Sequence, residues 1–445
     1  MLSTFFGLEI ARRALAAQQA ATDVTGHNIA NADTPGYTRQ RADLAASDPY
    51  TVPSLGTPVT AGQLGTGVTV QEVERVRDNF LDGQLRTEMS GLGRYQAQND
   101  ALSEVETIFN EPSDTGLNNM LNTFFNDWQE LSKNAESIPI RTSLVQDAVT
   151  LTDQFNHLYT QLETVKGNLN DLQQIDVGDI NSKAQQIADL NVQIQNLITA
   201  GEQPNDLLDR RDALLDDLSK LADLTVKDSG GGAIQVSVGS TLLVDGTTAN
   251  TISDVTGINS GALKGISDAL TMVSNYEAKL NSLAANIISS VNGAHQAGYD
   301  LNGNQGGDFF TGTGASDIAV NADIVSDVSK VAAAGAAGAP GDGTNAQKIA
   351  DLQNATIDGL SQATFNSYYQ SLISGLGVDA QQSQQMVTNQ QALVDQLNNR
   401  KQSISGVSLD EETTNLMQYQ HGYEAAARLV TVLDDMLDTL INRMG

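Results

Sequence analysis

The chain has 445 residues, a length that suggests about three domains at roughly 150 residues each. It carries 24 Lys plus Arg against 54 Asp plus Glu, and the net charge of −30 argues against nucleic acid and anionic membranes as partners, because both bind basic proteins. The absence of Cys excludes disulfides, thiolate metal sites and a Cys nucleophile.

The N-terminal segment predicts a helix rich in alanine. Leu8, Ala11 and Leu15 recur at helical spacing, and the many small residues around them allow a second helix to approach closely. This segment does not resemble a cleaved signal peptide, because Arg12 and Arg13 lie within the apolar pattern instead of ahead of it. No run of about 18 apolar residues occurs. The protein is therefore expected to be either cytoplasmic or exported by a route that uses no cleaved signal.

Residues 23–37 predict the end of this helix followed by a turn. The segment is dense in Asn, Asp and Thr, whose side chains bond to nearby backbone groups. Pro35 and Gly36 turn the chain, and Tyr37 is suited to anchor it. Four of the eight prolines lie between residues 35 and 58, so that region is expected to be extended.

Most of residues 70–222 is expected to form long helices that lie side by side. Aromatic residues make up only 5% of the chain, so the core must consist mainly of aliphatic side chains, which favours packed helices. One heptad stripe comprises Leu144, Ala148, Leu151, Phe155, Leu158, Leu162, Val165, Leu169 and Leu172. A further helix is expected to begin just after Pro204, with Asn205 or Asp206 as its N-cap.

The pattern changes at the three glycines 230–232. Apolar residues alternate over 233–238 and resume at 242–244 after a short loop that contains glycine, which predicts a β-hairpin. Helix is expected again over 267–296. The following Asp300 segment begins like a calcium-binding loop, but Gln305 and Thr311 occupy the positions of the required Gly and Glu, so a simple turn is favoured.

The last hundred residues contain no proline and are expected to be helical from residue 345 onward, with breaks near 375–377 and 405–406. Their strongest feature is the C-terminal heptad stripe: Leu416, Tyr419, Tyr423, Ala426, Val430, Leu433, Leu437 and Leu440. More than three unbroken heptads favour packing against a partner helix as in a coiled coil, over an ordinary amphipathic core helix.

No local pattern predicts catalysis, a cofactor or a metal site. No Lys follows a Gly, which excludes a Walker A loop, and neither a Gly-x-Ser-x-Gly nor a His-Glu-x-x-His motif occurs. The histidines at 27, 157, 295 and 421 are scattered and are expected at the surface or in turns. Adjacent acids are common, but in so acidic a chain they predict solvated faces.

The segment Asn28-Ile29-Ala30-Asn31 followed by Thr34-Pro35-Gly36-Tyr37 closely resembles the N-terminal signature of the axial proteins of the bacterial flagellum. Three further stretches, at residues 204–212, 291–300 with Phe309-Phe310, and 405–412, resemble the hook-associated protein FlgK family, the first hook–filament junction protein. The resemblance spans nearly the whole chain. Larger relatives insert outer domains after the Phe-Phe pair, and this chain resembles a short form that lacks them.

The resemblance implies a mainly α fold, an elongated rod of long helices with coiled-coil-like paired terminal helices and a small inserted β element. It implies a terminal helical inner layer around the export channel, formed by residues 1–45 and 405–445. A helical rod domain is expected over 46–224 and 263–404, with a small β-hairpin element over 225–262.

The resemblance and the heptad pattern together predict an assembly interface on the terminal helices. Its residues are Leu8, Leu15, Asn28, Ile29, Asn31, Pro35, Tyr37, Leu416, Tyr419, Tyr423, Val430, Leu433, Leu437 and Leu440. If the terminal helices run antiparallel, Arg12 and Arg13 would face the acids near the chain's end. The hypothesis is that Arg12, Arg13, Asp434, Asp435 and Asp438 set the helix register.

The resemblance implies a self-assembling structural protein of the hook–filament junction that allows filament growth. Expected partners are copies of itself in a ring, hook protein below, the second junction protein and filament above, and an export chaperone at the C-terminal helix. Neither a cofactor, nucleic acid nor a membrane is expected, and the location is outside the cell. The alternatives are another axial protein (the second junction protein, hook or rod), a secreted enzyme on a flagellin-like scaffold, or a cytoplasmic coiled-coil scaffold.

Overall fold

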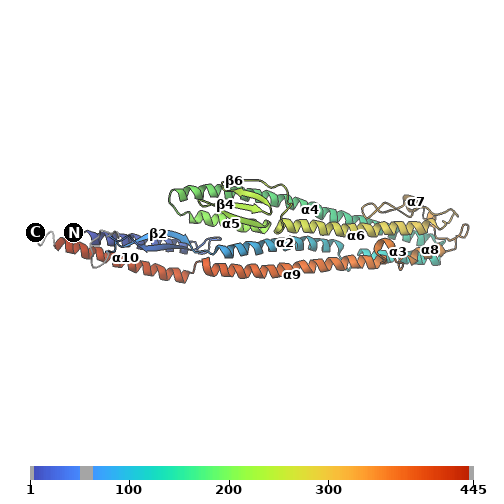
Figure 1. Cartoon of the computed structure of the whole chain (residues 1–445). Helices are drawn as coiled ribbons and strands as arrows, with labels where there is room; N and C mark the ends of the chain where they lie inside the picture. Colours follow the sequence, from blue (N-terminus) through green and yellow to red (C-terminus); the bar gives the residue numbers. More distant parts are fainter. Residues whose placement is uncertain (1–4, 51–63, 440–445) are drawn as a thin grey trace. The chain divides into compact units, whose positions relative to one another are not determined.

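A computed structural model describes residues 5–50 and 64–439, and their fold is mainly helical (Figure 1). The α-helices are α1 (Phe6–Ala30), α2 (Asn79–Phe109), α3 (Leu117–Lys133), α4 (Ile138–Thr199), α5 (Asn205–Leu221), α6 (Ala262–Gln296), α7 (Ala322–Ser326), α8 (Thr344–Asp351), α9 (Phe365–Ser405) and α10 (Leu409–Asp438), with 3-10 turns η1 (Val328–Lys330) and η2 (Asp358–Leu360). The strands are β1 (Gln40–Ala46), β2 (Val68–Arg75), β3 (Leu224–Gly230), β4 (Ala233–Val238), β5 (Thr241–Asp245), β6 (Thr248–Ala249), β7 (Phe310–Thr311) and β8 (Ala319–Val320). The prediction of a mainly α protein with small β elements is confirmed.

The chain forms two compact units. Unit 1 contains residues 1–90, 179–259 and 390–445, and unit 2 contains residues 91–178 and 260–389. The helices α2, α4 and α9 each contribute residues to both units. No helix of the described residues has the length and apolar composition needed to cross a membrane.

Unit 2 has a continuous core of aliphatic and aromatic side chains. The predicted heptad stripe on α4 is buried from Leu144 to Leu169, but Leu172 is 43% exposed, so the stripe ends one step earlier than predicted. At one end of this core the rings of Phe124, Trp128 and Phe309 pack together with centroids 5.2–6.3 Å apart. Large interlocking side chains give this unit a core of its own.

Two residues of unit 2 depart from the surface positions that their type predicts. His295 is fully buried and is held by backbone groups, because Nδ1 lies 2.7 Å from the Gly307 carbonyl and Nε2 accepts the Ala332 N–H at 2.8 Å. Burial lowers the pKa of His295 to about 4, so it stays neutral. The expectation of a surface or turn position is wrong for this histidine. Arg141 is buried too and donates to the carbonyls of Ala135 and Val331.

The loops of unit 2 are closed by short hydrogen-bonded turns. Asp300 accepts the backbone N–H groups of Asn302 and Asn304, each at 2.8 Å, which confirms the predicted turn. Strands β7 and β8 pair antiparallel, with Phe310 opposite Val320. The chain between them turns within seven residues, where the resemblance implied that larger relatives carry outer domains.

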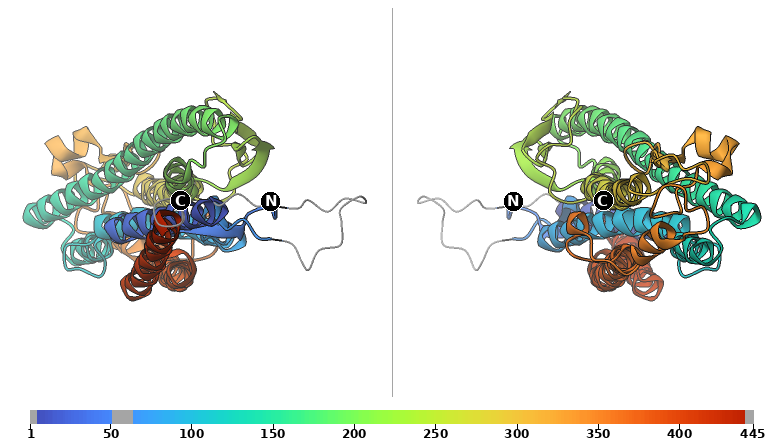
Figure 2. Two further views of the ribbon diagram at one scale, coloured as in Figure 1. Left: turned by 90° about the vertical axis from the view of Figure 1, so that its left-hand side faces the viewer. Right: turned by 90° about the vertical axis from the view of Figure 1, so that its right-hand side faces the viewer.

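Unit 1 contains the predicted β element, which is larger than a hairpin. β4 and β5 form the expected hairpin, and β3 and β6 extend it to a four-stranded antiparallel sheet in the order β3-β4-β5-β6. Asn191 of α4 donates to the Ile234 and Gly246 carbonyls at 3.1 and 2.6 Å, which fixes the sheet on the end of that helix. Figures 1 and 2 show the sheet beside α5 and the last part of α4.

The other part of unit 1 joins the two ends of the chain. α1 and α10 lie side by side near the termini, and the antiparallel pair β1–β2 packs on α1 (Figure 1). The sequence pattern predicted an extended segment here but no strand pairing, and it assigned the residues of β2 after position 70 to helix. That assignment is wrong, since these residues form a strand. The alternation of Val68, Val70 and Val73 is short and interrupted, so the sequence pattern did not reveal the strand.

Two predicted breaks in the last hundred residues have different outcomes. The break at 405–406 is confirmed, since α9 ends at Ser405 and α10 begins at Leu409. The break at 375–377 is wrong, because α9 runs through both glycines without interruption. A glycine lowers helix stability by only about 1 kcal/mol, so two of them do not end a helix of this length.

Candidate assembly interface

The helices α1 and α10 run antiparallel and approach closely. A Cβ atom placed on Gly7 would lie 3.2 Å from the Leu433 side chain, and one placed on Gly422 would lie 2.8 Å from Cδ of Gln18. Near the end of α1, the side chain of Asn28 donates a hydrogen bond to Glu412 of α10. The residue numbers in each pair add to 440, so the register is constant. Gly422, which no sequence pattern explained, thus lies at a close contact between the two helices.

The predicted stripe residues on α10 face α1, but the cover is partial. Ala426 is buried, whereas Leu416, Tyr419, Val430, Leu433 and Leu437 are only half-buried, as are Leu8 and Leu15 on α1. Tyr423 is 42% exposed. Leu440 lies outside the described residues. A single α1 helix with small side chains therefore leaves much of the stripe open.

A second apolar stripe on α10 is exposed, and the sequence analysis missed it. This outer stripe comprises Leu429, Val432 and Met436, which are 43–59% exposed. At 3.6 residues per turn it lies about 110° around the helix from the C-terminal heptad stripe. The spacing of three and four residues from Leu429 to Met436 was the signal available in the sequence.

Asn28, at the centre of the N-terminal signature, is a buried hydrogen-bonding hub that is only 1% exposed. Its Nδ2 group donates to the Gln40 carbonyl at 2.8 Å and to Glu412 Oε2 at 3.0 Å. Its Oδ1 atom accepts the Tyr37 hydroxyl at 2.8 Å and the Gln40 N–H at 2.9 Å. Burial, with nearby Asp206, Asp209 and Glu412, raises the pKa of Tyr37, so this hydroxyl stays protonated and donates.

Glu412 on α10 is a further buried residue of this region, and no sequence pattern pointed to it. Its side chain is 2% exposed and pairs with Arg39, whose Nε lies 2.7 Å from Oε1. Arg39 also binds Glu411 at 2.9 Å, and its backbone N–H donates to the Ser405 carbonyl at 2.9 Å. The chain that leaves the N-terminal helix is therefore tied to the start of α10.

The remaining signature residues build the turn after α1. Asn31 donates to the His27 carbonyl at 3.0 Å and accepts from Thr34, while Ile29 is half-buried and Pro35 is exposed. Gly36 has a positive φ of 80°, which suits glycine at this turn. The turn brings Tyr37 back onto Asn28. Asn28, Asn31 and Tyr37 thus lie within one local structure.

The predicted register charges are arranged differently from the hypothesis. Arg12 and Arg13 both pair with Glu9 on their own helix, at 2.7 and 3.0 Å. These two contacts hold the pKa of Glu9 at about 2. In the observed register Arg12 lies level with residue 428, which is six and seven positions before Asp434 and Asp435. Glu9 is one turn away, so it satisfies both arginines before any acid of α10 can.

The stretch at 204–212 forms the acidic face of α5 and binds the terminal part of unit 1. Asp209 and Asp212 both accept from Arg75, at 2.7 and 2.8 Å. Further ion pairs complete a network of four cations and four acids: Arg75, Arg77, Arg86, Lys401, Asp82, Asp209, Asp212 and Asp216. Thr38 N–H also donates to Asp209 at 2.8 Å. This Asp–Arg network connects α5 with β2, α2 and α9.

The network is balanced in charge and mostly buried. Burial alone would raise the pKa of Asp212, but Arg77, Arg75 and Arg86 outweigh it and hold this pKa below its usual value. Arg77 is also desolvated, and Asp212 and Asp82 nevertheless raise its pKa. Each charge is therefore stabilised by its neighbours, and removal of one leaves another unpaired.

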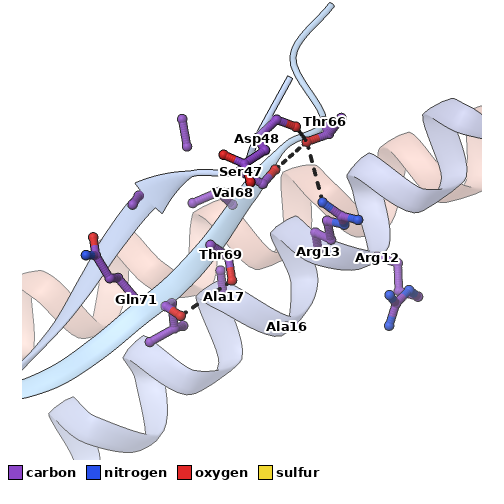
Figure 3. Close-up of a pocket in the computed structure, with 13 residues that line it drawn as sticks. Arg12, Arg13, Ala16, Ala17, Ser47, Asp48, Thr66, Val68, Thr69 and Gln71 are labelled. Atoms are coloured by element: carbon purple, nitrogen blue, oxygen red, sulfur yellow. Dashed lines mark hydrogen bonds between the residues drawn. The ribbon is translucent and has the colours of Figure 1, made fainter. Parts of the chain in front are cut away.

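An open groove of about 860 Å³ lies between α1 and the strands β1 and β2 (Figure 3). Arg12, Arg13 and the alanines of α1 line one wall. On the other, Ser47 and Thr66 share a 2.7 Å hydrogen bond, and Thr66 is bonded to the Asp48 carbonyl (Figure 3). These polar atoms bind one another. Within residues 5–50 and 64–439, no cluster of three His, Asp or Glu residues is arranged to hold a metal ion.

Comparisons with known proteins find matches along the chain. The family model described as the flagellar hook-associated protein FlgK helical domain matches residues 102–259 and 253–310. The model of the flagellar basal body rod FlgEFG protein C-terminal matches residues 402–444, and that of the flagella basal body rod protein matches residues 8–38. Both ends of the chain therefore carry sequence patterns found in rod proteins.

Full-length relatives are similar over nearly all of their length. The flagellar hook-associated protein 1 of Bacillus subtilis is 36% identical over 506 aligned residues, covering 100% of this chain and 99% of the relative. Its counterpart in Escherichia coli is 28% identical, covering 96% and 98%. In fold, the chain is similar to the flagellar hook junction protein FlgK of Burkholderia pseudomallei, with a TM-score of 0.66 and 16% identity over 73% of this chain and 100% of that one.

Proposed function

The chain belongs to the flagellar hook-associated protein 1 (FlgK) family, and we propose that it builds the hook–filament junction by assembling through its paired terminal helices. It is a structural component of the flagellum in this proposal and not an enzyme. The observation that carries the proposed interface is the apolar surface that α10 leaves uncovered in a single chain.

This surface has two parts. The C-terminal heptad stripe is only half covered by α1, and the outer stripe of Leu429, Val432 and Met436 is 43–59% exposed in the single chain. Exposed apolar patches of this kind mark binding surfaces, since each Å² removed from water stabilises an interface by about 25 cal/mol. Two stripes on one helix suit contacts to two neighbours, as a ring of identical subunits requires.

The proposal includes finer assignments, which family membership supports. Residues 1–45 and 405–445 form the inner layer around the channel, 46–224 and 263–404 the helical rod, and 225–262 the β element. The partners are copies of the chain, hook protein on one side, and the second junction protein with the filament on the other. The protein is exported without a cleaved signal, and an export chaperone covers the apolar stripes of α10 before assembly.

Deletion of the gene tests the proposed function. We expect cells to keep their hooks, to lack filaments and to release flagellin into the medium, as electron microscopy and blotting of the supernatant would detect. Reintroduction of the intact gene should restore filaments. Normal filaments in the deletion strain would reject a junction role and favour another axial position.

Substitution in the outer stripe tests the proposed interface. Leu429→Ser with Val432→Ser should give secreted protein that does not support filaments, because both side chains are exposed in the single chain and contribute little to its fold. The matched control, Thr431→Ser, changes an exposed residue off the stripe and should leave filaments intact. Full motility of the double variant would remove the outer stripe from the interface.

A further inference from the structure

We propose that the buried polar cluster of Asn28, Arg39 and Glu412 fixes the register of α1 against α10. The inference deepens the proposed function, because it names the residues that align the two helices of the proposed assembly surface. It replaces the hypothesis in which Arg12 and Arg13 set the register. The residues of the cluster are not part of the apolar stripes.

Asn28 has no hydrogen-bonding capacity left over. Its two N–H groups and its two acceptor sites are used by Gln40, Tyr37 and Glu412 at 2.8–3.0 Å. Three of these four bonds come from Tyr37 and Gln40, in the segment that follows α1, so they orient the amide whether or not α10 is in place. The remaining N–H points at Glu412 and is available for a single acceptor on the partner helix.

The buried carboxylate of Glu412 needs the other two residues of the cluster as partners. It is 2% exposed, and its two oxygens are taken by Asn28 and by Arg39. A buried carboxylate without partners is strongly disfavoured. The cation is itself held in place, because the Arg39 backbone donates to Ser405 at the end of α9. The acid therefore finds both partners at one position only.

The apolar stripe alone does not fix this register. Its residues repeat every seven positions, so sliding α10 by seven places apolar side chains on apolar side chains again. The facing side of α1 is small, with Gly7, Ala11 and Thr25, and offers few shape constraints. After such a slip Asn28 would face Tyr419 or Ser405, and Glu412 would lose Asn28 and Arg39.

The absence of Cys makes the register measurable by disulfide cross-linking of the purified full-length chain. The pair Gln18→Cys with Gly422→Cys reports the observed register. The pairs Gln18→Cys with Asn415→Cys and Gln18→Cys with Leu429→Cys report a slip of seven residues in either direction. With the cluster intact, we expect the 18–422 disulfide to form at least tenfold more than either slipped pair.

Glu412→Ala should reduce the yield of the 18–422 disulfide several-fold and raise that of a slipped pair, and Glu412→Gln should do so less. Arg39→Gln should act like Glu412→Gln from the other side of the ion pair. The control is Asp410→Asn, which changes an exposed acid in the same turn of α10 and should leave all yields unchanged. Fluorescence of Trp128, the sole tryptophan, reports whether unit 2 remains folded in every variant.

An unchanged 18–422 yield in both Glu412→Ala and Arg39→Gln, with native Trp128 fluorescence, would overturn the inference. Equal loss in the Asp410→Asn control would also overturn it, since general charge would then be responsible. Filament assays separate this result from the proposed function. A slipped register with normal filaments would support the cluster and reject the paired helices as the assembly surface, whereas an unchanged register leaves the deletion test unaffected.

Discussion

The unit 2 core and the α1–α10 pair are both built on heptad patterns, yet they bury very different surfaces. On α4 the stripe from Leu144 to Leu169 is covered by its own chain, while on α10 only Glu412 and Ala426 are buried. The difference lies in the facing residues, because large side chains meet α4 and the small residues of α1 meet α10. Periodicity thus identifies the face of a helix that binds, whereas the size of the facing residues decides whether one chain can cover it.

The largest expected effect on stability comes from replacing one apolar side chain of the unit 2 core by Ala, compared with the same kind of change on α10. Phe124→Ala should lower the free energy of unfolding by about 3–5 kcal/mol, because a fully buried ring is lost. Leu433→Ala, in a half-covered position, should cost only about 1 kcal/mol in the isolated chain but should impair filament assembly. Urea unfolding and motility assays measure the two quantities. Similar losses of stability in both variants would contradict the comparison.

The Asp–Arg network should be the next most sensitive feature. Asp212→Asn removes one acid shared by Arg75, Arg77 and Arg86 and should cost about 3 kcal/mol, as for other buried ion pairs. Because the folded pKa of Asp212 lies below its usual value, its contribution is present above pH 4 and is lost as the pH falls below that. The variant should therefore lose less stability on acidification. Asp217→Asn, at an exposed pair, should change stability by less than about 1 kcal/mol.

A carboxyl group in unit 2 should show the opposite pH dependence. Burial raises the pKa of Asp127 to about 7, with help from neighbouring Asp147. A raised pKa stabilises the fold below the usual pKa, and this contribution is lost as the pH rises through about 7. Asp127→Asn should thus stabilise the protein at pH 8 by about 1 kcal/mol, a value discounted for solvent screening of a half-buried group. Thermal unfolding at pH 5 should reveal a smaller gain, and an equal gain at both pH values would exclude titration of Asp127.

The smallest effect is expected at Gly422, where α10 packs closely against Gln18 of α1. Gly422→Ala gains about 0.5–1 kcal/mol of helix stability, but its methyl group must displace the Gln18 side chain, so the net change should stay below about 1 kcal/mol. In a Gln18→Ala background the same substitution meets no obstacle and should give the full gain. Denaturation of the four proteins in this cycle tests the contact, and additive changes would show that the two residues do not interact.

The sequence predicted features with strong local signals. The heptad stripes, the break at 405–406, the hairpin after the three glycines and the turn around Pro35 and Gly36 all depend on periodicity or on the backbone preference of single residues. The signature residues Asn28 and Tyr37 were identified, although their partners were not. Family resemblance rather than chemistry selected them.

Long-range pairings account for most of what was missed. Glu412 follows two other acids in the sequence, Asp410 and Glu411, and nothing local indicates that this carboxylate alone is buried against Asn28 and Arg39. The same applies to β1 and β2, whose pairing joins segments more than 20 residues apart, and to Asp212 with its three arginines. The register hypothesis for Arg12 and Arg13 overlooked Glu9, an acid one turn away on the same helix.

The short pairing of β7 with β8 has a consequence for how this fold can acquire new parts. Thr311 and Ala319 lie opposite each other in the antiparallel pair β7–β8. A polypeptide inserted between them would therefore begin and end at adjacent points. A compact module grafted there would place no tension on the surrounding helices. The β7–β8 turn is thus suited to the insertion of an additional domain, and such an insertion would not disturb the aromatic core.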